Sequence, residues 1–269
     1  MPRIHFIEIN EQPWLPTSIR DQITDSLQFG VNLVPAFRPM VPRLQSVLDA
    51  TGSLSIVDMC SGGGGPWRDL APRIQARTTN GTAEPLQIWL TDKFPNLGAH
   101  QNVATSSGNH IAFFPEPVDV MNVRGELRGV RTMFTSFHHF APEQAQAILQ
   151  NAVDAGEGIG IFEVTRRAPS AIVLVWAWIF MLFVCTPWIR PFRWTRLLWT
   201  YLLPIVPLLL LFDGTVSCLR TYRPKELREI VSRLTGREYH WETAETSGKM
   251  PVTYLIGYPR IPSEAEHHA

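Results

Sequence analysis

A run of four glycines directly after a short apolar segment constrains this 269-residue chain more than any other feature. Residues 54–59, Leu-Ser-Ile-Val-Asp-Met, have the composition of a strand, and Gly62–Gly65 follow with Pro66 behind them. Glycine allows a sharp turn and a close approach of ligand to backbone, and proline suits the first turn of a helix. The pattern therefore predicts a strand, a ligand-binding loop and a helix in succession.

Further strand and helix signals alternate along the chain. Apolar residues at helical spacing predict two helices, over residues 17–29 and 39–50, before the first strand. Such alternation predicts an α/β fold whose mostly parallel sheet carries helices on both faces. A later helix is expected over residues 223–234. The remaining short β-rich runs lie at residues 86–91, 131–137, 158–164, 237–244 and 251–259.

The spacing within the glycine run separates three classes of ligand site. A P-loop needs Lys and Ser or Thr after its last glycine, where this chain has Pro66-Trp67. A dinucleotide fold needs G-x-G-x-x-G, and its third glycine would fall on Trp67. The pattern D-x-[GC]-x-G-x-G, by contrast, is matched at every position from Asp58 to Gly64.

With this motif the chain resembles the class I S-adenosylmethionine-dependent methyltransferases. Asp92 is similar to the family's second-strand acidic residue, which accepts hydrogen bonds from ribose hydroxyls, and residues 118–120 lie where adenine is held. Residues 134–140, FTSFHHF, resemble the family's fourth-strand segment. The resemblance covers residues 54–164 well and extends over 213–259. It implies a three-layer, doubly wound, mostly parallel seven-stranded sheet.

The same resemblance implies S-adenosyl-L-methionine as the cofactor. The two acidic residues, Asp58 and Asp92, are separated by 34 positions (92 − 58) rather than by about 20. A surface loop at residues 77–85 explains the extra length. Cys60 occupies the position of the usual first glycine. The expected cofactor-binding residues are Asp58, Cys60, Ser61, Gly62, Gly64, Pro66, Asp92, Lys93, Asp119, Val120 and Ser136.

Three residues are candidates for catalysis on the acceptor side: His138, His139 and Asp213. Either histidine could take a proton from an acceptor hydroxyl, and packing or capping of the following helix is the alternative for each. Asp213 could orient the acceptor or form an Asx turn with the next glycine. Arg166 and Arg220 could hold an acidic group of the acceptor or contact lipid phosphates. No metal is predicted, because no third ligand lies at useful spacing from the histidines.

Residues 168–212, which we call the apolar insertion, interrupt the otherwise polar chain. Residues 168–189 run 22 positions without a charge, enough to cross about 30 Å of hydrocarbon, whereas residues 197–212 are shorter and contain two prolines. Both flanks belong to one fold, so two spans would carry the arginines between them across the bilayer. We therefore expect a monotopic hairpin with arginines and tryptophans at headgroup level. Two spans, a dimer interface or a lid over an apolar pocket are the alternatives.

Composition supports this division of the chain. The 24 basic residues balance 24 acidic ones, so the net charge does not indicate nucleic-acid binding. The mean hydropathy is near zero because a polar domain and an apolar insertion are averaged. Three cysteines without metal-ligand spacing indicate reduced thiols. The N-terminus lacks an apolar signal stretch, so no export is predicted. The expected parts are an N-terminal helical extension or lid (1–50), a cofactor-binding core (51–167), the apolar insertion (168–212) and the rest of the core (213–269).

The sequence thus predicts a methyltransferase at the cytoplasmic face of a membrane. Its acceptor is expected to be an apolar or lipid-like small molecule, methylated on oxygen, nitrogen or carbon. Membrane lipid would be the partner of the apolar insertion, and a homodimer stays open. The competing hypothesis is a non-catalytic membrane adaptor that keeps the fold.

Overall fold

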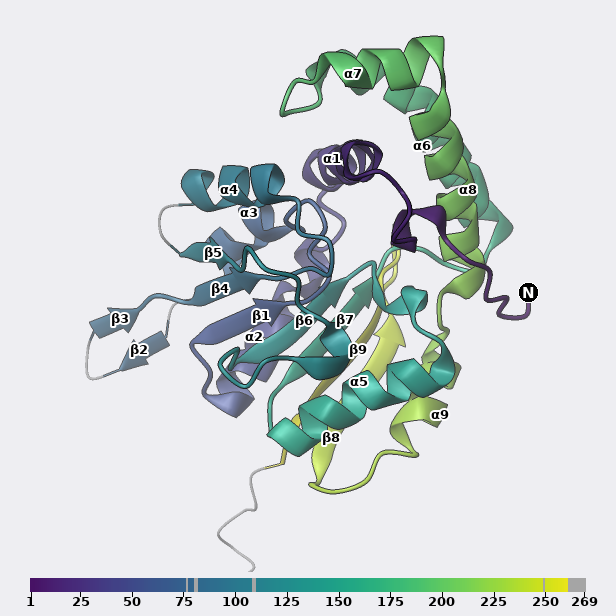
Figure 1. Ribbon diagram of the computed structural model, residues 1–269. Helices are drawn as coiled ribbons and strands as arrows, with labels where there is room; N and C mark the ends of the chain where they lie inside the picture. The colour runs from purple at the N-terminus through teal and green to yellow at the C-terminus, as the bar shows by residue number, and fades with distance from the viewer. Residues whose placement is uncertain (76, 80–81, 108–109, 249, 261–269) are drawn as a thin grey trace, which may run out of the picture.

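The protein is built on a mixed seven-stranded sheet (Figure 1). The computed structural model describes residues 1–260 apart from 76, 80–81, 108–109 and 249. The strand order is β5-β4-β1-β6-β7-β9-β8, and β9 runs in the direction opposite to the other six strands. The prediction of a mostly parallel seven-stranded sheet is therefore confirmed. The strands are β1 (Ser55–Asp58), β4 (Gln87–Leu90), β5 (Ile111–Phe113), β6 (Val130–Phe134), β7 (Ile159–Glu163), β8 (Tyr239–Glu245) and β9 (Thr253–Pro259).

Helices cover both faces of the sheet, because successive strand residues point to opposite sides. Ile56 of β1 joins one apolar core and Val57 joins the other. The first core includes α2 (Val41–Thr51), α3 (Trp67–Leu70) and α4 (Leu97–Ser106), and the second includes α5 (Pro142–Ala155) and α9 (Pro224–Val231). The three-layer arrangement that the sequence predicts is thus present.

The apolar insertion forms an arch beside the sheet (Figure 1). It contains α6 (Pro169–Cys185) and α7 (Trp194–Leu197), continues as a π-helical turn, η7 (Leu198–Leu202), and enters α8 (Ile205–Arg220). The α6 and α8 helices pack together, and α8 packs on α1 (Thr17–Leu33). A third apolar core joins α1 to the insertion through Ile23, Leu182 and Val206.

Two local expectations change in the folded chain. The α8 helix continues through Phe212 to Arg220, so the expected boundary at residue 212 falls inside a helix. The stretch 77–85, predicted as a loop, contains the short antiparallel strands β2 (Arg77–Thr79) and β3 (Thr82–Glu84), while residues 80–81 between them lie outside the described residues. Residues 261–269, the end of the predicted C-terminal part, also lie outside them.

Candidate active site

The glycine loop leaves the carboxyl end of β1 in a strongly turned conformation. Cys60, Gly62, Gly64 and Gly65 all have positive φ, between +54° and +111°. A Cβ on Gly64 would meet Val103 Cγ2 at 2.6 Å, whereas a Cβ on Gly62 would find no described atom within 4 Å. Gly64 is therefore required by packing against α4, and the open side of Gly62 is where a ligand can approach the backbone.

Asp92 holds this loop from the end of the neighbouring strand. One of its carboxylate oxygens accepts a hydrogen bond from the Gly62 N–H at 2.8 Å, and the other accepts one from the Phe94 N–H at 2.8 Å. The Val118 N–H donates to the Asp92 carbonyl at 2.9 Å. The predicted second-strand acid, the glycine loop and the segment at 118–120 therefore meet at one edge of the sheet.

Asp58 lies beneath the loop rather than on its surface. Its side chain is 1% exposed, and one carboxylate oxygen accepts a hydrogen bond from the Thr132 hydroxyl at 2.7 Å. Its other oxygen has no hydrogen-bond partner among the described residues. Burial raises the pKa of Asp58 to about 7. A buried, half-satisfied carboxyl at this position can receive a cationic donor from a ligand.

The Cys60 thiol lies among carboxylates. Burial, followed by the nearby charges of Asp92 and Asp58 and more weakly of Asp119 and Glu11, raises the pKa of Cys60. The thiol therefore stays neutral and acts as part of the loop rather than as a nucleophile. The carboxylates around it give this sheet edge a negative potential, which favours a cationic ligand.

Of the remaining predicted cofactor-binding residues, some are buried near the glycine loop and others are exposed to solvent. Ser61 is buried and its hydroxyl donates to the Asp58 carbonyl at 2.8 Å, so it fixes the loop. Pro66 is buried as the N-cap of α3, and Val120 is buried in the core. Lys93 and Asp119 are exposed, and Asp119 caps the short η4 helix (Val120–Asn122) through the Met121 N–H.

The chain turns sharply between β6 and the paired histidines. Thr135 has φ of +49°, which costs on the order of 1–3 kcal/mol for a residue other than glycine. The Thr135 and Ser136 hydroxyls have no hydrogen-bond partner among the described residues. Both lie just beyond the carboxyl end of β6, the strand that pairs with β1. The strained backbone and the two buried hydroxyls without partners are a second indication of a ligand-binding site at this turn.

The His138 side chain is fully buried, and Glu163 holds its ring in place. His138 lies on η5 (Phe137–His139), and its Nδ1 lies 2.8 Å from Glu163 Oε2 at the end of β7. The other oxygen of Glu163 accepts hydrogen bonds from the Phe137 and His138 N–H groups. Burial alone would raise the pKa of Glu163, but contact with His138 outweighs it and lowers that pKa.

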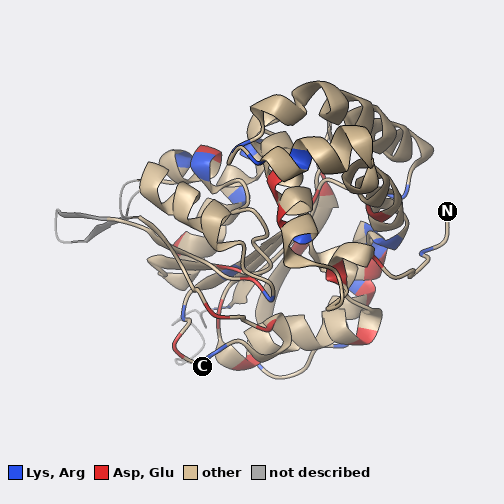
Figure 2. Cartoon of the chain, turned by 45° about the horizontal axis from the view of Figure 1, so that its top comes forward, with Lys and Arg blue, Asp and Glu red and all other residues tan. Residues whose placement is uncertain are grey.

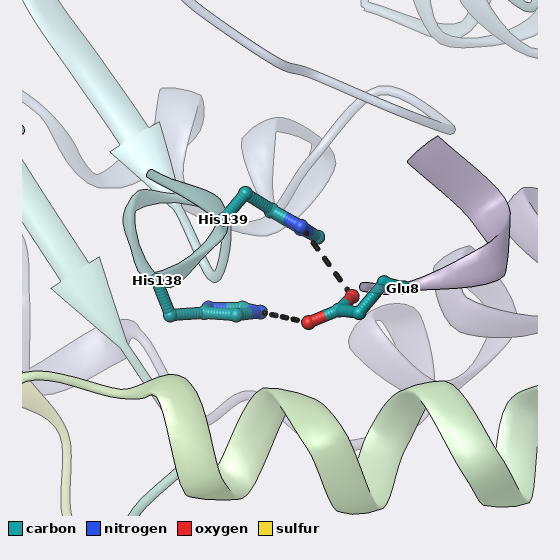
Figure 3. A group of neighbouring side chains, drawn as sticks. All are labelled: Glu8, His138 and His139. Atoms are coloured by element: carbon teal, nitrogen blue, oxygen red, sulfur yellow. Dashed lines mark ion pairs between the residues drawn. The ribbon is translucent and has the colours of Figure 1, made fainter. Parts of the chain in front are cut away.

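Glu8 and Glu11 from the N-terminal segment complete the cluster (Figure 3). Glu8 Oε1 lies 3.6 Å from His138 Nε2, and Glu8 Oε2 lies 3.4 Å from His139 Nδ1. Glu11 also pairs with His139 Nδ1. Burial lowers the pKa of the His139 ring, but Glu8 and Glu11 overcome this and raise it to about 9. The sequence offered no sign of this contact, because Glu8 lies far from the histidines along the chain.

The other acceptor-side candidates already have protein partners. The two carboxylate oxygens of Asp213, inside α8, accept hydrogen bonds from the Ile9 and Asn10 N–H groups, so the residue anchors the N-terminal segment and forms no Asx turn. Arg220 is 1% exposed, lies 3.0 Å from Glu11 Oε1 and donates to the His138 carbonyl. It is therefore unable to contact lipid phosphate. Arg166 pairs with Glu245 at the surface.

The α1 helix, part of the N-terminal segment expected to be an extension or lid, covers the glycine loop through contacts that the sequence did not predict. Gln28 Nε2 donates to the Gly65 carbonyl at 2.8 Å, and a Cβ on Gly63 would meet Gln28 Cβ at 2.7 Å. From α4, His100 Nε2 lies 3.0 Å from the Gly62 carbonyl. Burial lowers the pKa of His100, so its ring is neutral and donates to that carbonyl. Neither helix carries a sequence motif that links it to the loop.

These features define the α/β fold of class I methyltransferases: the sheet order with antiparallel β9, and the glycine loop tied to an acid on the next strand. No protein-family model and no curated sequence matches the chain significantly. Its structure is similar to mitomycin 7-O-methyltransferase (13% identity, TM-score 0.50), covering 82% of this chain and 53% of that one. It is also similar to a Nostoc punctiforme protein assigned to the O-methyltransferases (11% identity, TM-score 0.50), covering 96% and 64%. The chain thus spans about half to two-thirds of these proteins, and the likeness shows the fold.

Proposed function

We propose that this protein transfers a methyl group from S-adenosylmethionine to a small-molecule acceptor. The main support is the glycine loop, which has free space beside Gly62 and is held by a hydrogen bond to Asp92 after the neighbouring strand. The sequence motif from Asp58 to Gly64 and the sheet order support the same assignment. The two structural relatives, both placed among O-methyltransferases, are consistent with it.

The residues present fit this cofactor. Its amino group and sulfonium are cationic, and the site offers the unpartnered oxygen of Asp58 and the carboxylate of Asp92. Each Asp92 oxygen accepts one hydrogen bond from the protein and retains a lone pair for a ribose hydroxyl. The open side of Gly62 leaves room that any side chain would fill.

The chain's own contribution to the reaction is alignment and exclusion of water. S-adenosylmethionine, when bound, supplies an electrophilic methyl group on a positively charged sulfur. The α1 helix covers the loop on one side, while His138 and His139 stand over the ends of β6 and β7. His139, which is a quarter exposed, is the histidine that an acceptor can reach, whereas the His138 side chain is 2% exposed. Positioning the two reactants in line and keeping bulk water out supplies most of the acceleration expected for such a displacement.

We further propose that the acceptor is apolar and is met at a membrane surface through the apolar insertion. A 20-residue helical stretch, Pro169–Trp188, is long and apolar enough to cross a bilayer, and only 22% of its most apolar part is buried in the protein. Figure 2 shows these helices as nearly free of charge along their length. The large exposed apolar residues of the insertion include Val173, Leu174, Trp176, Phe180, Val184, Trp188, Trp194, Leu202 and Leu208. So many large exposed apolar side chains within one insertion are typical of a membrane or partner contact.

The tip of the insertion favours a helix pair lying on one leaflet. The segment from Trp194 to Leu202 meets α8 at a bend of 74°, and Arg193 and Arg196 near the tip bind Asp25 of α1. A tip held on the catalytic domain is not available to the far side of a bilayer. Because Arg193 and Arg196 pair with α1, they do not take the headgroup position that the sequence predicted for them. The exposed Arg190, Trp188 and Trp194 remain available for contact with headgroups.

Cofactor binding and methyl transfer test the proposal separately. Purified protein is titrated with S-adenosylmethionine in a calorimeter, and we expect binding that falls at least tenfold in Asp92→Asn. The variant places an amide N–H₂ against the Gly62 N–H and weakens acceptance from ribose hydroxyls. Asp154→Asn, an exposed carboxylate on α5, is the matched control and should bind normally. Absence of binding in the wild-type protein would overturn the proposal.

Transfer itself is measured with a labelled methyl donor and a membrane lipid extract. We expect label in an organic-soluble product, and none from Asp92→Asn. Binding of the cofactor without transfer to lipid-extract or soluble acceptors would contradict the catalytic assignment and favour the adaptor.

A further inference from the structure

We propose that Glu8, His138 and His139 form a binding site for a divalent transition-metal ion, with Zn²⁺ the best fit. Two imidazoles and one carboxylate are a donor set that zinc prefers when a fourth position is left for water or substrate. One ligand atom from each of the three residues lies within 4.8 Å of the others. Figure 3 shows both rings directed at the two oxygens of Glu8.

The separations suit coordination better than hydrogen bonding. His138 Nε2 lies 3.6 Å from Glu8 Oε1, and His139 Nδ1 lies 3.4 Å from Glu8 Oε2. These distances to Glu8 are long for N–H···O bonds. The hydrogen bond of His139 Nδ1 is made to Glu11 instead, and an ion bound at Nδ1 would replace it. With metal–ligand bonds of about 2.0–2.2 Å, two ligand atoms of a tetrahedral zinc site stand about 3.3 Å apart. Small shifts of the three side chains therefore suffice to accept an ion.

Glu163 prepares His138 as a ligand. Its Oε2 lies 2.8 Å from Nδ1, and its Oε1 accepts hydrogen bonds from two backbone N–H groups, so the carboxylate acts as an acceptor. With Nδ1 donating to it, the lone pair of the ring falls on Nε2. His138 is 1% exposed, and its Nε2 has no hydrogen-bond partner among the described residues. A cation placed between this lone pair and the Glu8 carboxylate would satisfy both groups. The carboxylate–histidine pair found behind metal-bound histidines is thus already in place.

The charges around the cluster also favour a dication. Metal coordination requires both histidines to be neutral, so binding of the ion would release the proton from His139. The carboxylates of Glu8 and Glu11 then face one buried guanidinium, that of Arg220, and the carboxylate of Glu163 lies against His138. The local sum is then −2 (one positive and three negative charges), which one divalent ion neutralises. Arg220 lies 3.5 Å from Glu8 Oε1 and donates to the backbone carbonyls of His138 and His139.

The open side of the site faces the acceptor region. The His139 side chain is 25% exposed and its neighbour Glu11 is 30% exposed, whereas the other two ligands, Glu8 and His138, are buried. A fourth position on that side could take water or an acceptor hydroxyl, whose pKa the ion would lower. This last role rests on the proposed methyltransferase function, but binding of the ion does not.

Zinc titration of the full chain tests the site. His267 and His268 near the C-terminus are replaced by Ala in every sample, so that this second histidine pair is removed from the measurement. After dialysis against a chelator, calorimetry with Zn²⁺ should show one equivalent bound, and Co²⁺ should give the visible absorption of a tetrahedral N/O site. No binding, or weak binding without Co²⁺ absorption, would overturn the proposal.

Three variants locate the ion. Glu8→Gln and His138→Asn should each weaken Zn²⁺ binding at least a hundredfold, while His110→Asn, an exposed histidine elsewhere, should leave it unchanged. Glu163→Gln is a positioning variant: its amide would donate to Nδ1, move the hydrogen to Nε2 and weaken binding about 10–100-fold. Far-ultraviolet circular dichroism checks folding. Unchanged affinity in folded Glu8→Gln and Glu163→Gln would show that the ion binds elsewhere. S-adenosylmethionine titration of the same samples separates this failure from failure of the proposed function.

Discussion

Asp25 on α1 and Arg196 in the apolar insertion form a fully buried ion pair, with Arg196 Nη2 donating to Asp25 Oδ2 at 2.5 Å. Both side chains are 1% exposed. Arg193 donates to the same carboxylate oxygen, and Asn96, the N-cap of α4, donates to the other. One carboxylate therefore joins the insertion, the helix over the glycine loop and the helix beside it.

Removing one partner of this pair should destabilise the protein strongly. We expect Asp25→Ala to lower the free energy of unfolding by about 3–5 kcal/mol, because the Arg196 charge stays buried without a partner. The double variant Asp25→Ala/Arg196→Met should lose less than the sum of the single losses. Urea denaturation measures all three proteins. Arg38→Ala, which breaks an exposed pair with Asp69, is the control and should cost less than about 1 kcal/mol. Additive losses would contradict the coupling.

Two glycines of the loop should respond differently to alanine. Gly62→Ala introduces a Cβ into open space, so we expect a loss of about 1 kcal/mol in stability from its positive φ and a much larger loss of S-adenosylmethionine affinity. Gly64→Ala forces a Cβ to 2.6 Å from Val103 and should mainly lower the melting temperature. Calorimetric binding and thermal unfolding of both variants compare the effects. Normal affinity in Gly62→Ala would place the ligand elsewhere.

Asp58 should make the apo-protein less stable as the pH rises. Its pKa is about 7 in the folded protein and 3.8 in the reference state, so between these values the native state binds the proton and the unfolded state does not. Stability from this group therefore falls as pH rises from about 4 to 7, by at most about 4 kcal/mol. Asp58→Asn keeps the acceptor for Thr132 and should flatten this part of the profile. Urea denaturation at several pH values checks it, and an unchanged slope would show that Asp58 titrates normally.

The exposed face of α6 should carry the membrane contact. Phe180 is 75% exposed and Val184 is 64% exposed. Replacing both by Gln should weaken cosedimentation with vesicles at least tenfold, since each buried apolar side chain contributes about 1.5–3 kcal/mol. Leu97→Gln, at a 47% exposed apolar residue on α4, is the matched control. Sedimentation velocity without lipid tests the dimer, and loss of a dimer with unchanged vesicle binding would assign this face to a second copy.

Some residues of the candidate site could be predicted from short sequence patterns, and others depend on contacts between distant parts of the chain. The loop from Asp58 to Gly65 and its partner Asp92 were found because a strand, a tight turn and an acid at a strand end each have a short sequence pattern. The contacts of Glu8, Glu163 and α1 with the site were not predicted beyond a general lid role for residues 1–50, because nothing near them in the sequence indicates which residues they contact. Asp213 lies close to the site, as predicted, but both of its carboxylate oxygens accept hydrogen bonds from backbone N–H groups of the N-terminal segment rather than facing an acceptor.

The sequence by itself determined the alternating α/β class, the glycine loop and an insertion too apolar for an ordinary surface. These depend on periodicity and on the conformational limits of glycine and proline, which act within a few residues. Only the tertiary structure decided that Glu8 meets both histidines and that Asp25 holds Arg196. Such contacts depend on how whole elements pack, because buried charges and lone pairs must find partners wherever the chain brings them. That requirement turned a pair of histidines into a candidate metal site and tied the apolar insertion to the glycine loop.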